Sequence, residues 1–113
     1  MKRKNVVFIS VPMAGKADAL IERAILVTKR KYLEATQQDI KDVVFVDNFQ
    51  NYEQIQIPDG ADASIIYLGE AIKKLATCDV AVFGKSWRDA RGCMIEHEVC
   101  TRYGINIFEI NEF

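Results

Sequence analysis

The sequence has no excess of basic residues, which excludes one broad class of function. Its 15 Lys and Arg residues are balanced by 16 Asp and Glu residues, so the formal net charge is −1. Proteins that bind nucleic acid regardless of its sequence depend on clustered Lys and Arg side chains. We therefore predict that the protein has no nucleic-acid partner.

The sequence also lacks a long hydrophobic run. No stretch approaches the roughly 20 apolar residues of a membrane-spanning helix. The basic run Lys2-Arg3-Lys4 leads directly into a predicted strand rather than into the apolar segment of a signal peptide. We therefore predict a cytoplasmic protein with no membrane partner.

Cysteines are few, and their number is odd. Cys78, Cys93 and Cys100 lack the spacing of a disulfide framework, which fits a reducing compartment. Cys93, His97 and Cys100 could share part of one helix face, but a structural zinc site usually takes four ligands in two chelating pairs. Neither pair is present. We expect core cysteines beside a surface histidine, with no bound metal and no organic cofactor.

The sequence does contain a regular alternation of strand and helix patterns. Its 113 residues suit a single domain spanning 1–113. Short apolar runs rich in β-branched residues predict buried strands, and apolar positions three and four residues apart predict helices. The strands are expected at residues 5–10, 43–46, 79–83 and 106–110, and the helices at 18–37, 62–77 and 86–104.

Helical crossovers between successive strands predict an α/β protein with a parallel sheet covered on both faces. We expect four to five strands in the order 2-1-3-4, with the topological switch between the first and third strands. Ligands bind at such a switch. It would bring together residues 10–16, 47–49 and 83–96.

The loop after the first strand is either a connector or a ligand loop. It is not a P-loop, because it has no second glycine upstream and no Lys-Ser/Thr pair. The ends of parallel strands that open onto helix N-termini bind anions and nucleotides. The candidate binding residues here are Ser10, Pro12, Met13 and Gly15 in the loop, with Asp47 and Asn48 at the end of the second strand.

The third helix is where we place the chemistry. Ser86, with Asp89 three residues on, is typical of a capping box, and Gly104 predicts the end of the helix. At about 100° per residue, Glu96 falls in the middle of an otherwise apolar face. That face carries Gly92, Cys93, Glu96, Val99, Cys100 and Tyr103.

A carboxylate on such a face needs a partner or a purpose, because burying an unpaired charge costs several kcal/mol. Glu96 could form a structural ion pair with Lys or Arg. It could instead attack an anomeric carbon and form a covalent glycosyl-enzyme intermediate. If the helix phase differs by a residue, Glu98 turns inward instead.

Other groups are expected around the mouth of this crevice. Asp89 and Arg91 would lie at the start of the helix, and Gly92 would let a ligand approach the helix backbone. Trp87 offers a flat surface that could stack a base, although an aromatic ring beside a sheet edge is more often simply packing.

Several segments together resemble the nucleoside 2-deoxyribosyltransferase-like superfamily, in particular a branch of short bacterial and phage proteins. They are residues 8–15, 67–69, 79–83, Trp87 and 90–98, and the resemblance covers nearly the whole chain. It implies a flavodoxin-like three-layer fold, usually in a homo-oligomer (a dimer or larger) with active sites near subunit contacts. Superfamily enzymes cleave the N-glycosidic bond of deoxynucleosides or their 5′-monophosphates.

The motif Gly-Thr/Ser-x-x-Glu-x-Gly-x-Ala carries the superfamily nucleophile. It is matched here by Gly92, Cys93, Glu96, Glu98 and Cys100. The resemblance therefore puts Glu96 at the nucleophile's position. Asp79 also matches, and residues 10–15 match the segment that lines the sugar or phosphate site.

The departures from the superfamily pattern affect the expected polar groups. Ala71 stands where many members have an Asp acting as acid or base, and Ala90 stands where an Asp or Ser holds the sugar or phosphate. Val11 also replaces a frequent glycine. Either the neighbouring Glu70 and Asp89 substitute, or the ancestral chemistry is lost.

The leading hypothesis is cleavage or transfer of the N-glycosidic bond of a nucleoside or nucleoside 5′-monophosphate. Glu96 would be the nucleophile, with Asp89 as a sugar-hydroxyl or proton-transfer partner and Arg91 as an anion anchor. The alternatives are a catalytically inactive nucleotide-binding or regulatory module on the same fold, and an interaction protein that uses the fold as a scaffold.

Overall fold

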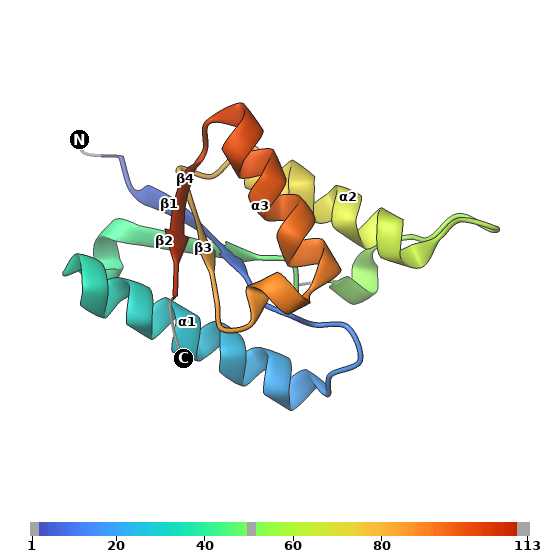
Figure 1. Ribbon diagram of the computed structural model, residues 1–113, viewed down its shortest axis with the longest axis horizontal. Helices are drawn as coiled ribbons and strands as arrows, with labels where there is room; N and C mark the ends of the chain where they lie inside the picture. Colours follow the sequence, from blue (N-terminus) through green and yellow to red (C-terminus); the bar gives the residue numbers. More distant parts are fainter. Residues whose placement is uncertain (1–2, 50–51, 111–113) are drawn as a thin grey trace.

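The computed structural model describes residues 3–49 and 52–110 of the chain (Figure 1). Strands and helices alternate along it. They are β1 (Asn5–Ser10), α1 (Asp18–Thr36), β2 (Val43–Asp47), α2 (Ala63–Leu75), β3 (Val80–Phe83), α3 (Arg91–Tyr103) and β4 (Asn106–Glu109). Three single-turn 3₁₀ helices join them, η1 (Ile40–Asp42), η2 (Tyr52–Gln54) and η3 (Trp87–Asp89).

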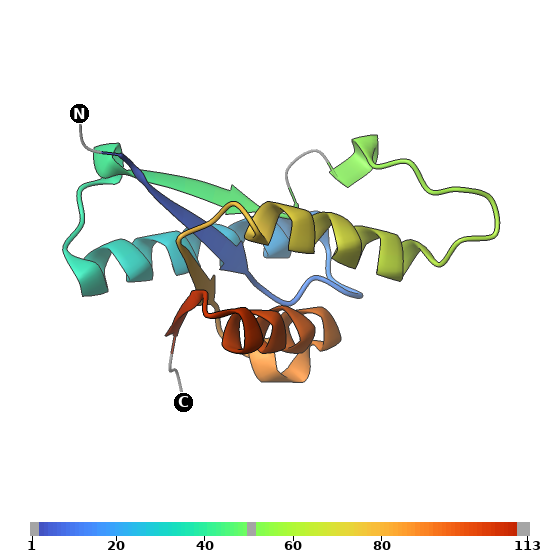
Figure 2. The same cartoon turned by 90° about the horizontal axis from the view of Figure 1, so that it is seen from above.

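The strands form one parallel sheet in the order β2-β1-β3-β4, which confirms the predicted topology. The described residues contain four strands. Helix α1 covers one face of the sheet, and α2 and α3 cover the other (Figures 1 and 2). The result is a three-layer α/β arrangement of the flavodoxin-like kind.

The core divides into two clusters because successive side chains of a strand point to opposite faces of the sheet. Val7 and Ile9 pack with Ile21 and Ile25 of α1. Phe8, between them in sequence, packs with residues of α2 and α3 on the other face. The phase of β1 therefore determines that Ser10, which is even-numbered like Phe8, faces α2 and α3.

Helix α3 begins later than expected. Ser86 has a left-handed backbone (φ 66°) and its side chain makes no capping hydrogen bond, so the predicted capping box with Asp89 is wrong. The chain instead forms η3, and α3 starts after Ala90. Gly104 ends the helix with φ 73°, as predicted.

Tyr103 was predicted on the inner face of α3, but it is 81% exposed. It is the last residue of the helix. A 13-residue helix is about 20 Å long, whereas the four-residue strands β3 and β4 span roughly 13 Å, so the end of α3 passes beyond the sheet that it covers.

Gly84 allows β1, β3 and α1 to meet closely. Its N–H donates to the carbonyl of Ser10 at 2.9 Å, which continues the pairing of the two strands. A Cβ atom at this position would lie 2.6 Å from Thr28 Oγ1 and 2.9 Å from Val11 Cγ1. Only glycine fits this contact without movement of its neighbours.

None of the helices in the described ranges is both long enough and apolar enough to cross a membrane.

Candidate functional site

A buried serine–glutamate pair lies at the carboxyl edge of the sheet. Ser10 is the last residue of β1, and Glu96 is in the second turn of α3. Ser10 Oγ donates a hydrogen bond to Glu96 Oε1 at 2.7 Å, and the two residues are 3% and 6% exposed. The pair therefore joins two segments that are 86 residues apart, next to the switch between β1 and β3.

The orientation of α3 decides which glutamate faces inward. Glu96 is buried, whereas Glu98 is exposed and forms an ion pair with Arg102 one turn along the helix. The inner position predicted for Glu96 is confirmed. The alternative of a structural ion pair is not: among residues 3–49 and 52–110, no Lys, Arg or His forms a salt bridge with Glu96.

The surroundings of Glu96 favour its protonated form. Burial raises its pKa from 4.5 to about 7, and the hydrogen bond from Ser10 offsets only part of that rise. Burial likewise raises the pKa of the Cys93 thiol to about 12 and that of Cys100 to about 11, and the charge of Glu96 adds to both. Both cysteines are therefore neutral thiols near neutral pH.

Asn48 places an unsatisfied acceptor on the same face of the sheet. Asn48 directly follows Asp47, which pairs with Ile9 in the β1–β2 register, and its side chain reaches α2. Asn48 Nδ2 donates to the Tyr67 carbonyl at 3.0 Å. The residue is only 8% exposed, and its buried Oδ1 has no hydrogen-bond partner in the part of the chain that the structure describes. A ligand hydroxyl or N–H could satisfy this atom.

The other binding residues predicted at the ends of β1 and β2 lie away from the buried pair or hold the turn that follows β2. Asp47 is buried, and its Oδ1 accepts a hydrogen bond from the Phe49 N–H at 2.9 Å, which turns the chain out of β2. Met13 packs against the α1 side of the core, and Pro12 is partly buried. Gly15 is exposed further along the loop.

The residues predicted at the helix mouth lie outside the buried pair. Asp89 and Arg91 are both exposed, and neither hydrogen-bonds to Ser10 or Glu96. Gly92, in the first turn of α3, has open space where a side chain would be. Geometry thus brings Ser10 to Glu96, while Asp89 stays at the surface.

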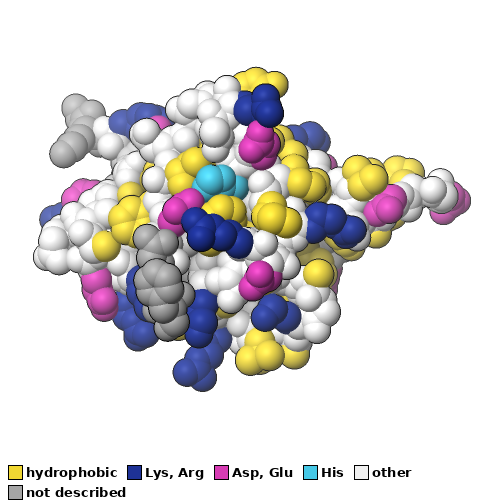
Figure 3. Space-filling view, in the orientation of Figure 1, with side chains coloured by type: hydrophobic (Ala, Val, Ile, Leu, Met, Phe, Trp, Pro, Cys, Tyr) yellow, Lys and Arg dark blue, Asp and Glu magenta, His cyan; other side chains and the backbone are white. Residues whose placement is uncertain are grey.

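Trp87 packs on a histidine that sequence analysis placed at the surface. The imidazole of His97 is partly buried and stacks on the indole, with ring centroids 4.2 Å apart and an interplanar angle of 11°. His97 Nε2 lies 2.8 Å from Glu109 Oε2. Figure 3 shows the imidazole at the surface among apolar and charged side chains. These residues come from η3, α3 and β4, so no single periodic pattern could have linked them.

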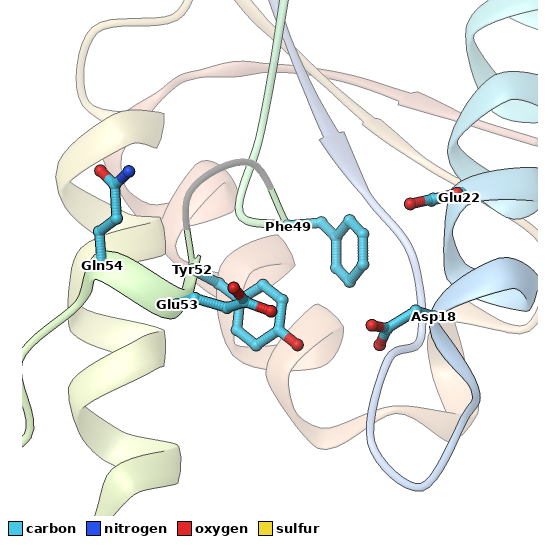
Figure 4. Close-up of a pocket in the computed structure, with 6 residues that line it drawn as sticks. All are labelled: Asp18, Glu22, Phe49, Tyr52, Glu53 and Gln54. Carbon is cyan, nitrogen blue, oxygen red and sulfur yellow. The ribbon is translucent and has the colours of Figure 1, made fainter.

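A cavity of about 270 Å³ lies beyond the end of β2. We call it the aromatic cavity. Figure 4 shows the rings of Phe49 and Tyr52 with carboxylates from α1 turned toward them. The residues that line it are Asp18, Glu22, Phe49, Tyr52, Glu53 and Gln54. Sequence analysis included Phe49 in the switch region but did not identify the other five.

The described residues contain no group of three or more His, Cys, Asp or Glu side chains arranged to hold a metal ion. No protein-family model, curated protein or solved structure matches the chain.

Proposed function

We propose that the protein cleaves or transfers the N-glycosidic bond of a nucleoside or nucleotide, with Glu96 as the nucleophile. The observation that carries this proposal is the Ser10–Glu96 pair at the switch point of a parallel sheet, where the buried carboxyl group has no cationic partner among residues 3–49 and 52–110. A carboxyl group buried for a structural ion pair would have a cationic partner beside it. Strongly perturbed carboxyl groups of this kind cluster at functional sites.

The reaction begins with the ionised form of Glu96. One carboxylate oxygen attacks the anomeric carbon, and a glycosyl ester forms as the bond from that carbon to the base nitrogen breaks. The electron pair of the broken bond passes to the base, which takes up a proton from water. Ser10 positions the group because its hydroxyl holds Oε1, which leaves Oε2 for the attack. Water or an acceptor base then takes the sugar and restores the carboxylate.

Asn48 fits the binding of the sugar. Its Oδ1 lacks a partner and lies on the same sheet face as Ser10, so a sugar hydroxyl could donate to it. This assignment gives a buried polar atom the hydrogen bond that it otherwise lacks, and leaving such an atom unsatisfied costs about 1–3 kcal/mol.

The experiment that tests this proposal is a substrate panel. The purified protein is incubated with deoxynucleosides, ribonucleosides and their 5′-monophosphates, with and without a free acceptor base, and base release and exchange are followed by chromatography. We expect turnover that is lost in Glu96→Gln and kept in Glu98→Gln, which removes an exposed carboxylate two residues away on α3. Full activity of Glu96→Gln would reject the nucleophile.

A second candidate function is a nucleotide-binding module without catalysis. It is favoured by Ala71 and Ala90, which supply no acid or sugar-binding group in positions where the resembled enzymes have one. Ala71 is fully buried within α2 and Ala90 is the N-cap of α3. Thermal stabilisation by nucleotides, without product from any member of the panel, would identify this function.

A further inference from the structure

The face of α3 that is turned away from the sheet carries two neighbouring exposed apolar side chains. Met94 is 46% exposed and Ile95 is 38% exposed, whereas the buried residues of α3 are Cys93, Glu96 and Cys100. In Figure 1, α3 lies in front of the sheet, and no other long helix or strand of the described residues crosses over it. This outer face of α3 is therefore open to a partner.

Two charged side chains flank the apolar pair along the helix. Arg91 lies three residues before Met94, and it is exposed. Glu98 lies three residues after Ile95, and it is exposed as well. Positions i, i+3, i+4 and i+7 share one side of a helix, so these four residues form a single row, which we call the outer stripe. Its order along the helix is positive, apolar, apolar, negative.

The outer stripe is complementary to itself when two copies of α3 pack antiparallel. A two-fold axis that passes between Met94 and Ile95 sets each of these side chains against the other in the second copy. Arg91 and Glu98 lie equally far from that axis, roughly 5 Å along the helix at its usual rise per residue. Arg91 of each copy therefore comes opposite Glu98 of the other. In a parallel pair, each charge would instead face its own kind and repel it.

Both charges of the outer stripe are available for this contact. Arg91 forms no ion pair within residues 3–49 and 52–110. Glu98 pairs with Arg102 through Oε1, and the side chains of this pair stay 56% and 74% exposed. Its Oε2 can accept a second cation. An arginine from another copy would extend the pair into a network of three charges, which stabilises more than a single surface pair does.

We propose that the outer stripe of α3 is an interface with a second copy of this chain, in which the two α3 helices pack antiparallel about a two-fold axis. Interlocking of the side chains of the two helices covers Met94 and Ile95 of both copies. The charges select the partner and the direction, because complementary charges give an interface specificity more than affinity. One pair of helices makes a small interface, so the association is weak and depends on concentration. No substrate enters this inference, which stands apart from the proposed function.

Sedimentation velocity at a series of protein concentrations tests the interface. We expect a monomer–dimer equilibrium with a dissociation constant of roughly 10–500 µM. Arg91→Glu and Glu98→Arg each set like charges opposite one another at both contacts, so each should weaken the association at least about tenfold. The control is Leu26→Glu, which changes an exposed apolar side chain of α1 and should keep the association. A wild type that stays monomeric up to about 1 mM, or single variants that associate as strongly as the wild type, would overturn the inference.

Mixing the two variants tests whether these charges meet across the interface. Arg91→Glu makes both ends of the outer stripe acidic, and Glu98→Arg makes both ends basic. In a mixed pair, opposite charges meet at both contacts, so an equimolar mixture should associate as strongly as the wild type and thereby show that both variants are folded. A mixture of Glu98→Arg with Arg30→Glu, which reverses an exposed charge on α1, should not recover the association. Failure of the first mixture to associate, or equal recovery in the second, would overturn the inference.

Discussion

The raised pKa of Glu96 predicts that the site destabilises the protein at neutral and alkaline pH. In the unfolded chain the carboxyl group ionises near its ordinary pKa of 4.5, whereas in the folded protein it ionises near 7. Between these values the folded state binds more protons than the unfolded state. The free energy of unfolding therefore falls as the pH rises from 4.5 to 7, and it levels off above 7.

The size of this effect follows from the two pKa values. They differ by about 2.5 units, and one unit corresponds to about 1.36 kcal/mol, so full ionisation of Glu96 costs about 3 kcal/mol. Glutamine resembles the protonated acid in shape and can still accept the Ser10 hydroxyl hydrogen bond. We expect Glu96→Gln to be more stable than the wild type by about 3 kcal/mol at pH 8 but by only about 1 kcal/mol at pH 5.

Urea unfolding at a series of pH values from 5 to 8.5 measures this difference. The control is Glu98→Gln, because Glu98 lies on the same helix but is exposed. Its stability relative to the wild type should change little over this range. A Glu96→Gln variant that is less stable than the wild type at pH 8, or whose advantage does not depend on pH, would refute the reasoning. If Glu96→Gln gains stability but loses turnover, the glutamate is retained for function at the expense of stability.

Three further predictions follow from the same structure. If Glu96 is the nucleophile, kcat/KM should rise with pH through a midpoint near 7, because only the ionised form attacks; a rate that is flat from pH 5.5 to 8.5 would contradict this. Gly84→Ala should lower the free energy of unfolding, measured by the same urea titration, by about 1–3 kcal/mol, because the added Cβ atom has no room. Gly69→Ala, in the exposed middle of α2, should instead raise the free energy of unfolding by up to about 1 kcal/mol. Asp79 accepts a hydrogen bond from the Val6 N–H at 2.8 Å, and this bond holds the pKa of Asp79 below 3.8. Asp79→Asn should therefore lower Tm at pH 7, and the loss should shrink as the pH falls below 3.8. An equal loss of Tm at all pH values would contradict this prediction.

The sequence by itself determined the architecture, because the patterns that encode it are local. A period of two or a continuous apolar run specifies a strand, and a period of 3.6 specifies a helix, so the four strands and three long helices could be read along the chain. Crossover helices then require parallel pairing, and the order β2-β1-β3-β4 was predicted correctly as that of a doubly wound sheet with a switch between the first and third strands. The same helical period placed Glu96 inward.

Backbone details at the helix ends were less predictable. Ser86 and Asp89 have the right spacing for a cap, yet the left-handed conformation of Ser86 prevents it. Local propensities are weak there and are overridden by packing.

Only the tertiary structure decided what the site contains. The Ser10–Glu96 hydrogen bond, the hydrogen bond from Asn48 Nδ2 to the Tyr67 carbonyl and the stacking of His97 on Trp87 each join different segments of the fold. The aromatic cavity likewise needs α1 and η2 to face each other. Each of these depends on where a side chain points once several elements have packed, and that direction is set by the sum of long-range contacts rather than by any local repeat.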